Sequence, residues 1–299
     1  MSLSRWFRAL VVIVTLGPFK VAAQAVCGTP GKDGPGGTLT GIVNTYYPGL
    51  TATASGTGAI VLGSATGALS TITPGDLLLI IQMQDASINS SNSSAYGDGT
   101  TTGSGSTNLN NAGRYEYVTA TNSVGAGGGS LSFRGTGVGN GLLNSYVNAA
   151  ATGTQGQRRY QVVRVPQYSQ ATLGSGLTAG YWNGTTGGIL AIDVAGQLTL
   201  GGTVSVNGRG FRGGAGLGFN GGAGGSNADF VNLSSNPFHG IKGEGIAGTP
   251  RWVLDPQTSL NIDLGAEGYP AGDAARGAPG TAGGGGTDGN PTGNDQNSG

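Results

Sequence analysis

The sequence has few of the side chains on which metal sites and most catalytic sites depend. It contains one cysteine, Cys27, and one histidine, His239, and only 9% of its 299 residues are charged. A single cysteine excludes an intrachain disulfide and a cysteine-based metal site, so we expect Cys27 to be a free thiol near a terminus or a partner for another chain. A single histidine excludes sites with two or three histidine ligands. We expect His239 to be a surface residue rather than part of a Ser-His-Asp arrangement.

Common catalytic motifs are missing as well. The chain has no G-x-S-x-G, no phosphate loop and no H-E-x-x-H. Residues 208–213 match G-x-G-x-x-G, but a dinucleotide fingerprint requires a helix to follow, and the glycines that follow each cost a helix about 1 kcal/mol. The same pattern recurs at 216–221. Glycine density explains both matches, and we expect no nucleotide cofactor.

The N-terminus has the features of a secretory signal. Arg5 and Arg8 precede a short apolar stretch at 9–19, and Ala23 and Ala25 form an A-x-A cleavage site. The apolar stretch is about half of the roughly 20 residues that a membrane span needs. We therefore predict a signal peptide over residues 1–25, a secreted, extracellular or cell-surface location, and no membrane span after its removal.

Charge excludes nucleic acid as a partner. Removal of Arg5, Arg8 and Lys20 leaves 14 − 3 = 11 basic side chains against 14 acidic ones, a net charge of −3. Proteins that bind nucleic acid need clustered Lys and Arg to neutralise phosphates.

What the chain has in abundance is glycine, 63 of 299 residues, about three times the average usage. No window has the apolar periodicity of a helix, so the predicted fold is all-β. The predicted strands, separated by glycine or asparagine turns, are 57–62, 76–84, 114–121, 130–134 and 160–165. We expect residues 38–172 to form a compact antiparallel β domain.

Beyond residue 179 the expected strands are very short: 189–192, 198–200 and 204–206. Such strands with sharp glycine corners favour a parallel β-helix-like region over 179–279, and the alternative is an ordinary β-meander. Residues 280–299 hold no large apolar side chain, so we expect a flexible, disordered tail.

Acidic residues supply the one enzymatic alternative, because β-helix polysaccharide lyases and glycoside hydrolases use carboxylates. Glu244, Asp255 and Asp263 are the catalytic candidates in the stretch 229–267. The further acidic, basic and aromatic residues that could take part in such a site are Asp229, Lys242, Arg251, Trp252 and Glu267. Aromatic residues that are either sugar-stacking platforms or core residues are Tyr46, Tyr47, Tyr181, Trp182 and Trp252.

Calcium is the only metal that the loops suggest. Residues 283–288 match the start of a calcium-binding nonapeptide, but the apolar residue that should follow is Asn290. Asp98 and Asp288 are weak calcium candidates. Asp33 is more typical of a solvated turn.

Several phrases together resemble a known group of proteins. They are GDLLLIIQMQDA (75–86), NNAGRYEYV (110–118), QVVRVPQYS (161–169), YWNGTTGGILAIDVAGQLTLGGTVSVNGRGFRGG (181–214) and KGEGIAGTPRWV (242–253). They resemble the N-terminal region of large, glycine-rich, adhesin-like bacterial surface proteins of unknown function. Longer members continue into further glycine-rich sequence and Ig-like repeats, whereas this chain stops at Gly299. The resemblance implies an exported surface protein and assigns no catalytic residue.

Together these features predict an exported, non-enzymatic structural or adhesive protein that binds a glycan or a cell-surface protein. The alternative is a polysaccharide lyase or glycoside hydrolase that uses the carboxylates in 229–267. The sequence specifies neither the ligand nor the oligomeric state.

Overall fold

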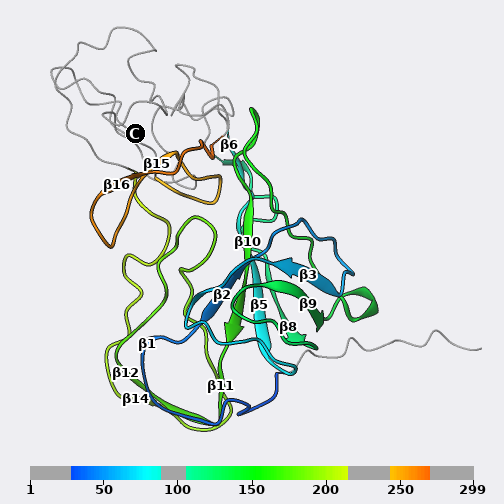
Figure 1. Cartoon of the computed structure of the whole chain (residues 1–299), viewed down its shortest axis with the longest axis vertical. Coiled ribbons are helices and arrows are strands. Elements are labelled where there is room, and N and C mark those ends of the chain that lie inside the picture. Colours follow the sequence, from blue (N-terminus) through cyan, green and yellow to red (C-terminus); the bar gives the residue numbers. More distant parts are fainter. Residues whose placement is uncertain (1–27, 89–105, 215–242, 270–299) are drawn as a thin grey trace, which may run out of the picture.

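The computed structural model describes residues 28–88, 106–214 and 243–269, which form an all-β structure, as predicted (Figure 1). The only helical element among them is a short 3-10 helix, η1 (Val138–Asn140). None of these residues belongs to a helix long and apolar enough to cross a membrane. The predicted signal peptide (1–25) and tail (280–299) lie outside the described residues.

The largest unit is a seven-stranded antiparallel sheet with the order β3-β9-β8-β5-β10-β2-β4. Its strands are β2 (Thr45–Pro48), β3 (Ala59–Leu62), β4 (Thr66–Gly67), β5 (Leu77–Gln84), β8 (Tyr115–Ala120), β9 (Gly129–Arg134) and β10 (Arg159–Val165). All five strands predicted between residues 57 and 165 are present, with bounds that differ by at most two residues. A smaller antiparallel pair, β6 (Ser87–Ile88) and β7 (Ser106–Asn108), extends from this unit.

Strand β5 is central because its residues are apolar in succession. It pairs with β8 on one side and β10 on the other, so both of its edges are covered and both faces can accept apolar side chains. Leu78 and Ile80 are fully buried in the main core cluster, where they pack with Val118 and Val162.

A second, parallel sheet adjoins the first. It consists of β1 (Pro35–Ile42), β12 (Gln170–Thr178) and β14 (Leu198–Leu200) in that order, and a parallel pair of β11 (Gln167–Tyr168) and β13 (Asp193–Val194) continues it. The two ends of the predicted antiparallel domain (38–172) thus pair in parallel, and the antiparallel sheet is confined to residues 45–165.

A parallel β-helix over 179–279 is not shown. Residues 198–200 form β14 as predicted, but 189–192 and 204–206 are not strands. In 189–192, backbone groups form hydrogen bonds with side chains instead of with another strand. The Tyr46 hydroxyl donates to the Ile189 carbonyl, and the Asn44 side-chain amide accepts from the N–H and donates to the carbonyl of Ala191. The last described strands, β15 (Trp252–Leu254) and β16 (Asn261–Asp263), form an antiparallel hairpin.

Glycine permits the close approach of successive chain passes in the parallel region. A Cβ atom on Gly202 would lie 2.4 Å from the Ser175 backbone nitrogen, and one on Gly174 would lie 2.6 Å from the Thr38 methyl carbon. Neither distance is possible for a larger residue unless neighbouring atoms move. Glycine here allows tight stacking as well as turning corners.

Candidate functional site

The parallel sheet presents a row of threonines on one face. Thr38 of β1 pairs with Thr172 of β12, which pairs with Thr199 of β14. Partners in register lie on the same face of a sheet, about 4.8 Å apart from strand to strand. Thr38 and Thr199 are exposed and Thr172 is half-buried. Within the described residues the three hydroxyls form no hydrogen bond with the protein.

The opposite face of the same strands carries leucines. Leu39, Leu173 and Leu200 are the partners next in register. Leu39 is buried in an apolar cluster with Ala171 and Leu177, and Leu173 packs against it. The alternation of Thr and Leu therefore gives β1 and β12 one polar, outward face and one apolar, inward face, whereas the leucines of β14 are exposed.

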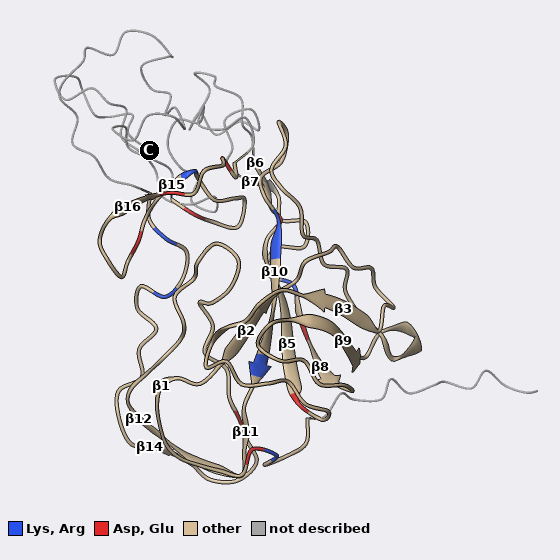
Figure 2. Cartoon of the chain, viewed as in Figure 1, with Lys and Arg blue, Asp and Glu red and all other residues tan. Residues whose placement is uncertain are grey.

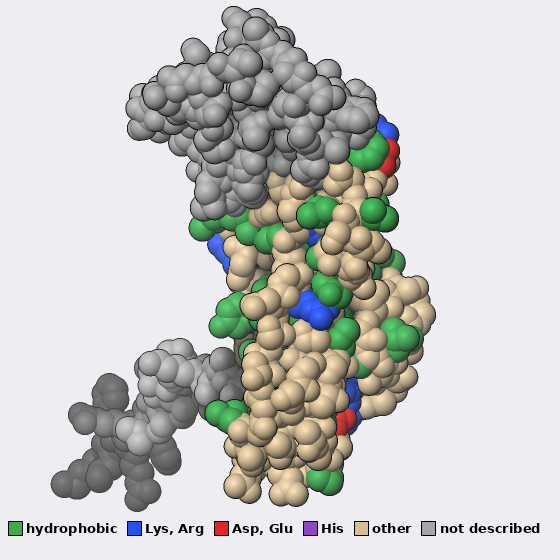
Figure 3. Space-filling model, turned by 90° about the vertical axis from the view of Figure 1, so that its left-hand side faces the viewer, with side chains coloured by type: hydrophobic (Ala, Val, Ile, Leu, Met, Phe, Trp, Pro, Cys, Tyr) green, Lys and Arg blue, Asp and Glu red, His purple; other side chains and the backbone are tan. Residues whose placement is uncertain are grey.

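Beside the threonine row lies a shallow depression of about 230 Å³. Its lining residues are Pro35, Gly37, Gln170, Ala171, Thr172, Gln197 and Thr199. The side chains that line it include hydroxyls and amides, which both donate and accept hydrogen bonds, and none of them is charged. In Figure 3, which views the molecule from the side of β1, β12 and β14, the lower part of the surface is accordingly almost free of charged atoms.

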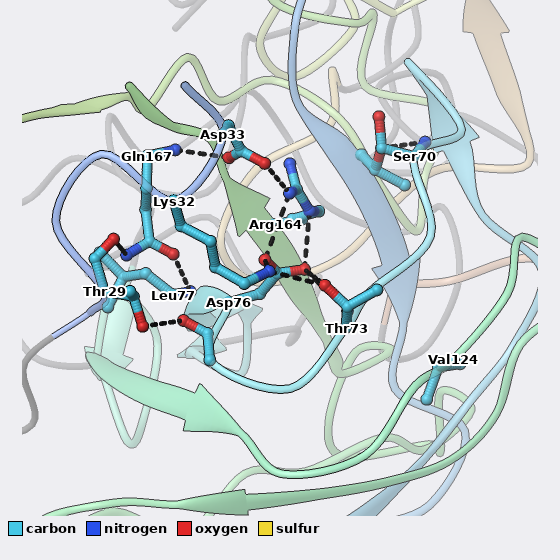
Figure 4. A network of polar contacts seen from close by, with 12 residues as sticks. Thr29, Lys32, Asp33, Ser70, Thr73, Asp76, Leu77, Val124, Arg164 and Gln167 are labelled. Atoms are coloured by element: carbon cyan, nitrogen blue, oxygen red, sulfur yellow. Dashed lines mark hydrogen bonds and ion pairs between the residues drawn. The ribbon is translucent and has the colours of Figure 1, made fainter. Parts of the chain in front are cut away.

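A buried ionic network holds the parallel strands against the antiparallel sheet (Figure 4). Arg164 of β10 donates from Nε and Nη2 to the two carboxylate oxygens of Asp76, at 2.9 and 3.2 Å, and from Nη2 to Asp33. Lys32 forms an ion pair with Asp76 and donates to the Thr73 hydroxyl at 2.6 Å. Two cations thus neutralise two carboxylates.

The network keeps Asp76 ionised. Burial is the largest influence on this carboxyl and raises its pKa, but the hydrogen bonds from Arg164, Lys32 and the Thr73 backbone outweigh it, so the pKa is lowered. Burial likewise lowers the pKa of Arg164, but the hydrogen bonds to Asp76 and Asp33 prevail and raise it. The mutual stabilisation identifies these groups as a structural clamp.

Gln167 connects this clamp to the start of the parallel sheet. Its backbone N–H donates to Asp33 Oδ2 at 2.7 Å. Its side chain accepts from the Leu77 N–H at 2.8 Å and donates to the Thr29 carbonyl at 2.8 Å. Asp33, predicted to be a solvated turn residue, is instead half-buried and fixed by Arg164.

Of the predicted catalytic acids, Glu244 is the most deeply buried, at 4% exposure. Arg212 binds both of its carboxylate oxygens, at 2.7 and 2.8 Å, and the Thr249 hydroxyl donates at 2.9 Å. Gln84 and Gln157 in turn donate to Thr249 at 3.0 and 2.6 Å. All of these bonds are internal, so the carboxylate of Glu244 is held by protein groups and has little contact with solvent.

The other acids of this stretch have separate partners. Asp255 accepts from the Thr258 hydroxyl at 2.7 Å within its own turn. Arg251 binds both oxygens of Asp263 at 2.6 and 2.7 Å and holds the pKa of that carboxyl at about 2. Glu267 accepts from the backbone N–H groups of Arg251 and Tyr269. Asp229, Lys242 and His239 lie outside the described residues.

The glycine-rich motif at 208–213 serves packing. Arg209 stacks on the Tyr181 ring at 3.7 Å, and the Phe211 ring lies edge-on to that of Trp182 at 5.5 Å. Among the predicted sugar-stacking residues, Tyr46, Tyr47 and Trp182 are buried. The remaining two, Tyr181 and Trp252, are half-buried.

The weak calcium candidates Asp98 and Asp288 lie outside the described residues. Within the described ranges, no three His, Cys, Asp or Glu side chains come together as a possible metal site.

Sequence reasoning missed the threonine row. A signal for it exists in the Thr-Leu dipeptide, which occurs among the described residues at 38–39, 172–173 and 199–200 with a glycine one or two residues further on. The first two copies are 172 − 38 = 134 residues apart and the last two 199 − 172 = 27, so no constant period marks them. The row can therefore be recognised only once the strands are known to pair.

No protein-family model, no curated protein and no solved structure matches the chain. The resemblance to glycine-rich, adhesin-like surface proteins thus stays a prediction from the quoted phrases, and the function is argued from the geometry of the site.

Proposed function

We propose that this chain is an exported, non-enzymatic surface protein whose parallel strands form a rigid, uncharged binding face for a glycan or for the polar surface of a neighbouring protein. The observation that carries the proposal is the row of Thr38, Thr172 and Thr199, with Gln170 and Gln197 beside it.

Sugar hydroxyls both donate and accept hydrogen bonds, as threonine hydroxyls and glutamine amides do. A neutral row is therefore chemically matched to a neutral glycan, and it requires no charge partner. The hydroxyls bind no other described group, so they are free to exchange water for a ligand.

Rigidity supports the same function. The ionic clamp of Arg164 and the register of three parallel strands hold the row in place before any ligand binds, which lowers the entropic cost of binding. Weak individual contacts on a fixed row then add along the ligand.

For the fold we propose that residues 167–182 and 193–209 are successive turns of a short β-helix-like stack. The offset between partners is 193 − 167 = 26 at one end and 200 − 173 = 27 at the other. The hydrogen bond from the Trp182 N–H to the Arg209 carbonyl, 2.9 Å long, continues the same offset.

The enzymatic alternative has less support. A glycosidase needs two carboxyl groups that face one substrate, and Glu244, Asp255 and Asp263 each have their own hydrogen-bonding partners. The non-enzymatic proposal is accordingly the one that the described geometry favours.

Binding to a panel of neutral and acidic polysaccharides, measured by co-sedimentation or on an array, tests the proposal. The double variant Thr172→Val/Thr199→Val keeps the β-branched shape but removes two hydroxyls, so binding should fall at least tenfold. Thr121→Val, at an exposed threonine outside the row, is the matched control and should bind as the unmodified chain does. Equal binding by the double variant, or release of reducing ends or unsaturated sugars, would refute the proposal.

A further inference from the structure

Strand β14 ends the parallel sheet with an open edge. The Ala171 N–H donates to the Gln197 carbonyl, and the Gly201 N–H donates to the Leu173 carbonyl, both at 3.0 Å. Because a parallel strand alternates the direction of its backbone groups, the N–H and carbonyl groups of Leu198 and Leu200 point away from β12. No strand in the described part of the chain pairs with that edge.

The side chains along this edge are apolar and exposed. Leu200 is 78% exposed, Leu198 43% and Val206 46%. Leu200 continues the inward-facing column of Leu39 and Leu173, but no further strand covers it. Along this column the leucine side chains thus change from buried, at Leu39 of β1, to exposed, at Leu200 of β14.

Proteins usually protect such an edge with charge, proline or a bulge, and β14 has none of these. Between Asp193 and Arg209 no residue is charged, and the strands of this sheet carry no blue or red in Figure 2. The opposite edge, formed by β1, is protected: it begins with Pro35, and its pairing is interrupted by two irregularities in register.

The described chain offers little to cover β14 from within. Gly214, the last described residue before 215–242, bridges to Val253 of β15. Tyr269, the last described residue before 270–299, donates from its hydroxyl to the Gly243 carbonyl. In Figure 1 this region lies at the upper end and β14 at the lower end.

We infer that β14 pairs with β14 of a second copy, antiparallel and across a two-fold axis. Two-fold dimers are the commonest oligomers, and their interfaces are self-complementary. With Thr199 on the axis, Leu198 of one copy faces Leu200 of the other. The outward backbone groups then form about four hydrogen bonds.

This arrangement gives a continuous six-stranded sheet. The four leucines of the two edges form one apolar face, while the threonine row runs through both copies and doubles in length. The inference does not rest on the proposed ligand, because the open edge and the exposed leucines exist whatever the row binds.

The first test is the mass of the purified full-length chain by light scattering over a range of concentrations, with Cys27→Ser in every variant so that no native thiol can link two chains. We expect twice the mass of the purified chain, which is 29.3 kDa when all 299 residues are retained. Leu200→Lys should give the monomer. Val138→Lys, at a residue of similar exposure (83%) in the antiparallel unit, should remain a dimer. A monomer at all concentrations, or a dimer that persists in Leu200→Lys, would overturn the inference.

The second test fixes the register. Thr199→Cys in the same background places two thiols across the axis at a non-hydrogen-bonded position, where Cα atoms are about 4.5 Å apart and a disulfide can form. Mild oxidation should cross-link this variant as a dimer and leave Thr38→Cys, on the opposite edge, unlinked. Equal cross-linking of Thr38→Cys, or cross-linking only in a mixture of the two variants, would instead demonstrate head-to-tail stacking and contradict the two-fold pairing.

Discussion

Arg164 binds both carboxylate oxygens of Asp76 through Nε and Nη2, at 2.9 and 3.2 Å, and the side chains of both residues are almost fully buried. Arg164 lies in β10, and Asp76 directly precedes β5. These two strands pair at the centre of the main sheet. Asp33 and Lys32 join the pair from the segment that precedes β1. One arginine therefore links the antiparallel sheet to the start of the parallel one.

Loss of one partner from this clamp should destabilise the protein strongly. Asp76→Asn leaves Arg164 with one buried carboxylate partner fewer, and removing one member of a buried pair typically costs about 3–5 kcal/mol. Urea unfolding followed by intrinsic fluorescence measures the change. Asp263→Asn, which removes an exposed partner of Arg251, is the control and should change the midpoint little; similar losses in both variants would argue against a buried clamp.

The clamp also predicts how stability depends on pH. The pKa of Asp76 is lowered in the folded state from its ordinary value of 3.8, so the unfolded chain binds the proton more readily. The stabilisation is then fully present above pH 3.8 and is lost as the pH falls through the lower, folded-state pKa. The free energy of unfolding should fall below about pH 4, and this dependence should be weaker in Asp76→Asn. Asp263 contributes in the same direction, so the comparison is best made in an Asp263→Asn background.

Substitution by alanine should change the stability of the protein differently at Gly202 and at Gly210. Gly202→Ala places a Cβ atom 2.4 Å from the Ser175 nitrogen, whereas a Cβ on Gly210 meets nothing within 4 Å. Overpacking of the first kind typically costs about 1–3 kcal/mol, and Gly210→Ala should be neutral or stabilise by up to about 1 kcal/mol. Thermal unfolding of both variants measures the difference, and equal midpoints would show that the chain passes are not closely stacked.

Glu244 should prove to be a structural residue. In Glu244→Gln an amide nitrogen replaces one oxygen, so in either orientation of the amide an Arg212 N–H group faces a donor instead of an acceptor. We expect a clear loss of thermal stability and no change in sugar release from any polysaccharide. Asp255→Asn, at an exposed turn, should affect neither. Turnover by the unmodified chain that disappears in Asp255→Asn with unchanged stability would favour the enzymatic alternative.

The strands of the antiparallel sheet could be predicted from the sequence because the pattern of apolar and polar residues within each strand indicates it. The run at 77–84 is apolar in succession, and the strand at 115–120 alternates between exposed tyrosines and the buried Glu116 and Val118. Both patterns depend only on neighbouring residues. The strand at 198–200 was predicted for the same reason.

The features that could not be predicted depend on contacts with residues far away in the sequence. The prediction of a strand at 189–192 was wrong because Asn44 and Tyr46, more than 140 residues earlier, bond its backbone through their side chains. The parallel pairing of residues 35–42 has no local signal, since a strand does not specify its partner. Likewise, Glu244 looked available for catalysis because the sequence does not reveal that Arg212 lies against it.

The pairing of β1 with β12 has a consequence for how this protein reaches its native state. Their partners Thr38 and Thr172 are separated by 172 − 38 = 134 residues, so the first strand to be synthesised waits for most of the domain before it acquires a neighbour. Contacts this distant in sequence slow folding. Until β12 arrives, the glycine-rich beginning of the chain has to stay extended and accessible to periplasmic or extracellular proteases and chaperones, if the chain is exported as proposed.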